Sequence, residues 1–100
     1  MATVTATDTK TTVKLKEVKM WRVKLLNDDY TPFDFVIEVL CQLYGKDVEA
    51  ATLVATDIHN KGSGTAGIYT KEIALQKAKD TVQISRGNGH PLTAVAEEMA

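Results

Sequence analysis

The sequence predicts an α+β fold in which three helices pack on a small, three-stranded, mostly antiparallel sheet. Helical and strand-like apolar patterns follow one another in the order β-α-α-β-α-β, without an internal repeat or linker. No two strands are joined by the two-residue turn of a hairpin, so the sheet must assemble through the helices. The chain has 100 residues, 44% hydrophobic and 25% charged, which fits one small globular domain.

The segment before the first strand differs in composition from the rest. Residues 1–16 carry six threonines among small and charged side chains. Only Val4, Val13 and Leu15 could pack there, which is too little apolar surface to offset the entropy lost on ordering. The sequence therefore predicts a flexible, threonine-rich extension over residues 1–16 and a core domain over residues 17–100.

The first strand is expected over residues 18–26, because apolar side chains alternate along it. Trp21, Val23 and Leu25 would point to one face of the sheet, and the side chains between them to the other. One apolar face of this kind is what a layer of helices requires.

A first helix is expected over residues 32–44. Thr31 is the predicted N-cap, Pro32 suits the first helical position, and Gly45 can end the helix. One apolar stripe runs along this helix. Its members are Phe33, Val36, Ile37, Leu40 and Tyr44.

A second helix is expected over residues 48–60, with Asp47 as its cap and Gly62 as its stop. Ser63 and Gly64 would then form a turn before a short strand over residues 66–69.

The third helix should start after Thr70, its predicted cap, and end at the Gly87-Asn88-Gly89 segment. A last short strand is expected over residues 91–96. His90, just before this strand, is expected in a loop.

Composition excludes several classes of function. The formal net charge is -1, so no basic excess indicates nucleic acid or an anionic membrane surface as a partner. No apolar run approaches the length of a membrane span, and no secretory signal is recognisable. Cys41, the one cysteine, leaves no internal disulfide to form, which fits the expectation of a cytoplasmic protein.

Polar side chains gather where the first strand ends and the first helix begins. Asn27 and Asp29 lie in this connection, and His59 lies near the end of the second helix, on the face that carries Ala55 and Ile58. If the two helices pack side by side, these groups surround an apolar pocket. A carboxylate, an amide oxygen and a neutral imidazole nitrogen can together accept the hydrogens of an α-ammonium group.

Plainer interpretations of the same residues remain open at this stage. An Asn-Asp-Asp run before Thr-Pro is also ordinary turn composition, and a histidine near a helix end is often solvated or capping. Strand alternation turns Asp28 away from its two neighbours, which favours a capping or backbone role. No nucleophile adjoins a base, and no second histidine or cysteine stands at ligand spacing, so no enzyme, metal site or cofactor is predicted.

The segments LLNDDYTPFDFVIEVL, DVEAAT, IHNKG, GIYTKEIALQKA and GHPL resemble the ClpS family. That family consists of non-enzymatic N-degron adaptors that work with the ClpAP protease. The resemblance covers about residues 18–98, and its Asn-Asp-Asp-Tyr-Thr-Pro string is highly specific. It implies an adaptor that binds the free α-amino group and bulky hydrophobic first residue of a substrate. Substrates beginning with phenylalanine, tyrosine, tryptophan or leucine would then pass to a ClpA-type AAA+ unfoldase.

The resemblance also implies roles for particular residues. Asn27, Asp29 and His59 would bind the α-amino group, whereas Glu72 and Lys77 would dock the unfoldase. The side-chain pocket would consist of Leu26, Thr31, Phe33, Val36, Ala55, Ile58 and Leu92. The alternative is a protein-interaction domain of the same fold, for example a ribosomal-stalk-like module, without N-degron specificity.

Two positions depart from the pattern of many bacterial members of that family. Methionine is common where Phe33 stands at the pocket mouth, and also where Ala55 stands at its wall. We expect a pocket of similar volume but different shape, which keeps aromatic first residues as good ligands and makes leucine poorer.

Overall fold

The computed structural model describes residues 18–100, and its elements follow the predicted order β-α-α-β-α-β. The predicted extension over residues 1–16 lies outside the described residues. The elements are β1 (Trp21–Leu26), α2 (Phe33–Tyr44), α3 (Val48–Lys61), β2 (Ser63–Tyr69), α4 (Lys71–Gly87) and β3 (Thr93–Glu98).

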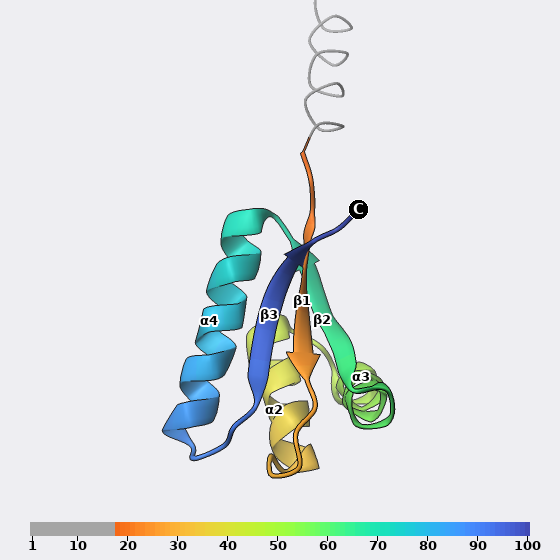
Figure 1. The fold of residues 1–100 in the computed structure, drawn as a ribbon. Coiled ribbons are helices and arrows are strands. Elements are labelled where there is room, and N and C mark those ends of the chain that lie inside the picture. The colour runs from red at the N-terminus through yellow and green to blue at the C-terminus, as the bar shows by residue number, and fades with distance from the viewer. Residues whose placement is uncertain (1–17) are drawn as a thin grey trace, which may run out of the picture.

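The sheet has the strand order β2-β1-β3, and both pairs are antiparallel. β1 is therefore the central strand, as Figure 1 shows, with α4 lying along β3, α3 beside the end of β2, and α2 behind the sheet. This confirms the α+β class and the three-stranded antiparallel sheet. Because β1 is central, the connection that follows it emerges in the middle of the sheet and leads into α2.

The core lies between the sheet and the helices. Val23 and Leu25 of β1 are completely buried, as the alternation predicts, and they pack in one cluster with Leu40 of α2. The opposite face of β1 carries Arg22 and Lys24, which pair with Glu97 of β3 at 3.2 and 3.6 Å. Small side chains let the helices approach this core closely. They are Ala51, Ala55, Ala66, Ala74, Ala78 and Ala94.

Helix ends follow the sequence signals in some places and depart from them in others. Asp47 caps α3 as predicted, because its carboxylate accepts the Ala50 N–H at 2.8 Å. The cap of α2 is Pro32, and not Thr31 as expected. The Thr31 side chain is oriented toward the connection instead, where its hydroxyl donates to the Asp28 carboxylate at 2.8 Å.

Strand boundaries also differ from the expected ones. Ser63 and Gly64 were expected in a turn but begin β2, because they pair with Leu26 and Leu25 of β1. β3 begins at Thr93, two residues later than expected. β1 begins at Trp21, three residues later than expected. Within residues 18–100, no helix has the length and hydropathy needed to cross a membrane.

The C-terminal end of α2 is joined to α4 by partly buried polar groups. The Tyr44 hydroxyl lies 2.6 Å from the Thr81 hydroxyl, and the Lys77 ammonium donates to the Leu43 carbonyl at 2.6 Å. Burial raises the pKa of Tyr44 to about 12, although its hydrogen bond with Thr81 acts in the opposite direction. The folded protein therefore favours the neutral phenol.

Replacing Tyr44 with phenylalanine is expected to lower the free energy of unfolding by about 1 kcal/mol at pH 7, because one buried hydrogen bond is lost. The raised pKa makes this contribution complete below about pH 10 and removes it as the pH rises through about 12. Urea unfolding of both proteins from pH 7 to 11.5 measures the difference. A difference that stays constant over this range would contradict the assignment.

Candidate functional site

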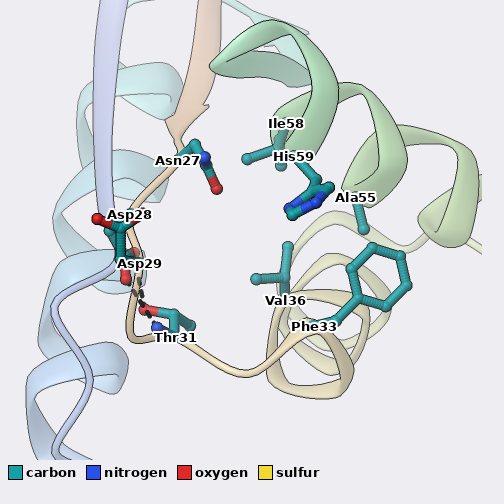
Figure 2. Close-up of a pocket in the computed structure, with 9 residues that line it drawn as sticks. All are labelled: Asn27, Asp28, Asp29, Thr31, Phe33, Val36, Ala55, Ile58 and His59. Atoms are coloured by element: carbon teal, nitrogen blue, oxygen red, sulfur yellow. Dashed lines mark hydrogen bonds between the residues drawn. The ribbon is translucent and has the colours of Figure 1, made fainter.

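A cavity of about 480 Å³ opens between the β1–α2 connection and the facing sides of α2 and α3. Its lining combines polar side chains from the connection with apolar ones from the two helices (Figure 2). The lining residues are Asn27, Asp28, Asp29, Thr31, Phe33, Val36, Ala55, Ile58 and His59.

Strand pairing brings the connection next to the end of α3. Leu26 pairs with Ser63, and one residue further on the Asn27 N–H donates to the Gly62 carbonyl at 2.9 Å. Gly62 ends α3 with a positive φ of 93°, three residues after His59. In Figure 2 the Asn27 amide and the His59 ring therefore approach the same space from opposite sides. Two side chains 32 positions apart in sequence become neighbours across one cavity.

Asp28 organises the connection from within. Its carboxylate accepts the N–H groups of Tyr30 and Thr31, at 2.8 and 2.7 Å, and the Thr31 hydroxyl at 2.8 Å. Burial by itself would raise the pKa of Asp28, but these three hydrogen bonds and the charge of His90 lower it overall. Asp28 thus stays ionised and fixes the turn that presents Asn27 and Asp29. This confirms the backbone role that the strand alternation favours.

The apolar part of the cavity is built by α2 and α3. Val36, Ala55 and Ile58 are at most 7% exposed, whereas Phe33 is 43% exposed and forms the rim. Ile58 is held against β2, because a Cβ added at Gly64 would lie 2.8 Å from the Ile58 side chain. The pocket floor is thus buried and closely packed against β2, whereas the rim at Phe33 is exposed.

Two residues expected in the pocket are not part of its surface. Among the described residues, the cavity lining includes neither Leu26 nor Leu92. Leu92 is 1% exposed and packs in the hydrophobic core, and Leu26 is half-buried in β1 between Ser63 and Thr93. Leu92 therefore belongs to the core instead of to the cavity, and Leu26 lies in the sheet outside the cavity lining.

The two residues assigned to docking lie on α4, away from the cavity. Glu72 is exposed in the first turn of this helix. Lys77 is half-buried, and its ammonium lies 5.8 Å from the ring centres of both Tyr44 and Tyr69. Glu72 is therefore free to meet another protein, whereas the charge of Lys77 is already engaged within the domain.

The site combines a rim of hydrogen-bond acceptors with an apolar recess. Asp29, Asn27 and a neutral His59 ring offer hydrogen-bond acceptors for a cationic donor. The recess below them can bury one apolar side chain. Within residues 18–100, no group of three or more histidine, cysteine or acidic side chains is placed to hold a metal ion.

Comparison with known families identifies the fold and its relatives. The family described as "ATP-dependent Clp protease adaptor protein ClpS" matches residues 16–95 of the chain. The chain belongs to the ClpS family. As a ClpS protein it is an adaptor of the Clp protease and not a protease itself. The match covers 80 of the 100 residues and includes every residue that lines the cavity.

Curated ClpS relatives resemble the chain over nearly its full length. It is 43% identical to the Helicobacter hepaticus adapter ClpS over 95 residues, which are 95% of this chain and 96% of the relative. It is 46% identical to Campylobacter jejuni ClpS over 92 residues, or 92% and 96% of the two chains. It is 43% identical to Deinococcus radiodurans ClpS over 91 residues, or 91% and 80%.

A solved ClpS structure has the same fold. The structure of Agrobacterium tumefaciens ClpS2 bound to L-phenylalaninamide superposes with a TM-score of 0.81 at 32% sequence identity. The match covers 83% of this chain and 100% of ClpS2. The similarity therefore extends to all of the ClpS2 chain in that structure.

Proposed function

We propose that this ClpS protein is an N-degron adaptor. It binds the free α-amino group and the bulky hydrophobic first residue of a substrate, and delivers that substrate to the ClpA-type AAA+ unfoldase of the ClpAP protease. The observation that carries this proposal is the lining of one cavity by Asn27, Asp29 and His59 together with the apolar recess. Binding of L-phenylalaninamide by A. tumefaciens ClpS2 supports it, because that ligand has a free amino group and an aromatic side chain.

The proposed roles follow from the chemistry of each side chain. The Asp29 carboxylate pairs with the ammonium charge, and the Asn27 amide oxygen and a neutral His59 nitrogen accept its remaining hydrogens. The first side chain of the substrate enters the recess between the two helices. The recess is formed by Thr31, Phe33, Val36, Ala55 and Ile58.

The magnitudes fit a transient adaptor. Burying a large apolar side chain contributes roughly 1.5–3 kcal/mol, and each hydrogen bond to a charged group about 1.5–3 kcal/mol. Part of this sum offsets the entropy lost on association. A dissociation constant on the order of micromolar results, which allows a substrate to be both captured and released.

Hand-over to the unfoldase is proposed to use the exposed start of α4. Glu72 supplies a free carboxylate there. Lys77 acts in this proposal through the aliphatic part of its side chain and by fixing α4 against α2, since its ammonium donates to Leu43. The adaptor would act in the cytoplasm without cofactors or catalysis.

The shape of the recess predicts the order of preferred first residues. Peptides that begin with phenylalanine, tyrosine or tryptophan should bind about fivefold more tightly than an otherwise identical leucine peptide. The reason is that Ala55 leaves space in the wall, and a planar ring reaching in past Phe33 fills it better than a short branched chain.

Fluorescence anisotropy with peptides that differ only in residue one tests this order and the proposed function together. A peptide beginning with glutamate is the matched control and should show no measurable binding at tens of micromolar. Tighter binding of leucine than of phenylalanine would refute the shape argument, and equal binding of all peptides would refute the proposed function.

A further inference from the structure

His90 occupies a rigid position in the connection between α4 and β3. Its N–H donates to the Ser85 carbonyl at 2.9 Å. Its own carbonyl accepts the Ser85 hydroxyl at 2.8 Å and the Arg86 guanidinium at 2.9 Å. Three hydrogen bonds thus hold the backbone of a residue that the sequence places in an ordinary loop. Because the backbone is held in this way, the His90 side chain can keep the groups that it contacts in a fixed position.

The side chain of His90 faces the elements that build the cavity. Its ring lies 4.5 Å from the ring of Phe35, centre to centre, at an interplanar angle of 59°. Phe35 is in the first turns of α2, two residues after the cavity rim at Phe33. The imidazole is also near enough to Asp28 for its charge to act on that carboxylate. His90 therefore contacts the start of α2 through Phe35, and its charge acts on Asp28 in the connection that leads to this helix.

Asp28, on which the charge of His90 acts, organises the part of the connection that lines the cavity. Its carboxylate binds Tyr30 and Thr31, and its chain neighbours Asn27 and Asp29 line the cavity. His90 itself does not line the cavity among the described residues. Any effect of His90 on a bound ligand must pass through the connection or through α2.

We propose that His90 is a positioning residue of the amino-group site, which braces the β1–α2 connection and Phe35 from behind so that Asn27 and Asp29 keep their orientation. This inference rests on the proposed function of the cavity. It goes beyond that function by assigning to the α4–β3 connection a role in ligand affinity. Because His90 does not line the cavity among the described residues, the brace should set affinity without setting the preference for one first residue over another.

The experiment compares His90→Ala with wild-type protein, using anisotropy titrations of phenylalanine-first and leucine-first peptides. His90→Ala should weaken both peptides about fivefold and leave the ratio of their dissociation constants unchanged. His90→Phe, which retains a ring against Phe35, should restore binding to within about twofold of wild type. Asn88→Ala is the matched control in the same connection, where the side chain donates to the Ile84 carbonyl. The Asn88→Ala substitution should lower the melting temperature without changing peptide affinity.

A double-variant cycle with Phe35→Leu separates positioning from general loss of stability. If His90 acts through its ring contact with Phe35, the double variant should bind no more weakly than Phe35→Leu alone. The inference would be overturned if the losses of affinity from the two single substitutions multiplied in the double variant. It would also be overturned if His90→Ala protein bound the peptides like wild type. The proposed function fails on a different result, namely wild-type protein that does not distinguish a free from an acetylated N-terminus.

Discussion

Replacing Ala55 with tryptophan is expected to weaken the binding of phenylalanine-first peptides by at least about tenfold. Ala55 is 2% exposed and forms a wall of the 480 Å³ cavity, so an indole at this position has to occupy the recess. The bound side chain would then lose its burial, which is worth roughly 1.5–3 kcal/mol. Anisotropy titration measures the loss, and thermal unfolding verifies that the variant is folded.

The matched control for this variant is Leu53→Trp, on the same helix. Leu53 is 71% exposed and does not line the cavity, so the same substitution there should leave peptide affinity unchanged. If Ala55→Trp bound the peptide as tightly as wild type while remaining folded, the recess would not be the place where the first side chain binds.

Removing the polar rim should have an effect of similar size. Asp29→Ala and His59→Ala are each expected to weaken a phenylalanine-first peptide by about tenfold or more, because a hydrogen bond to a charged group contributes about 1.5–3 kcal/mol. Asp29 should be the more sensitive of the two, since its carboxylate also neutralises the ammonium charge. Both side chains are exposed, so their removal should change the melting temperature little. Titrations of the two variants against the same peptide measure both effects.

Asp57→Ala provides the control for charge. Asp57 is an exposed carboxylate on α3 that pairs with Lys61 at 3.5 Å, and it does not line the cavity. The Asp57→Ala substitution removes the same charge as Asp29→Ala and should leave peptide binding unchanged. Equal losses from both variants would mean that net charge, and not a specific contact at the rim, controls affinity.

Much of the fold was predictable because its signals are local. The alternation around Val23 and Leu25 identifies the buried face of β1, and Asp47 forms the cap that its side chain suggests. Gly45 and Gly62 end their helices with positive φ angles of 66° and 93°, which glycine adopts without steric cost. Each of these signals depends on residues within one turn of the chain.

What sequence reasoning missed depends on contacts between distant segments. Thr31 suggests a helix cap, but its hydroxyl donates to Asp28, and this choice between two hydrogen-bond partners cannot be seen in a sequence. Ser63 and Gly64 look like a turn until β1 offers them partners. Leu92 is expected in the pocket, yet its side chain is 1% exposed and packs in the hydrophobic core.

The candidate site was predictable in its residue types and less so in its support. Asn27, Asp29 and His59 were expected to surround one pocket, and they line the same cavity. The hydrogen bond from Asn27 to Gly62, which closes that arrangement, could not be inferred from spacing. The contact between Phe35 and His90 is likewise a product of the tertiary fold, and no local pattern indicates it.

The most direct test of the proposed cavity function compares one phenylalanine-first peptide with a free and with an acetylated N-terminus, titrated against the wild-type protein. Acetylation removes the positive charge and crowds the rim at Asn27, Asp29 and His59. The account predicts at least about tenfold weaker binding of the acetylated peptide, or ~1.4 kcal/mol. Equal affinity for the two peptides would contradict it.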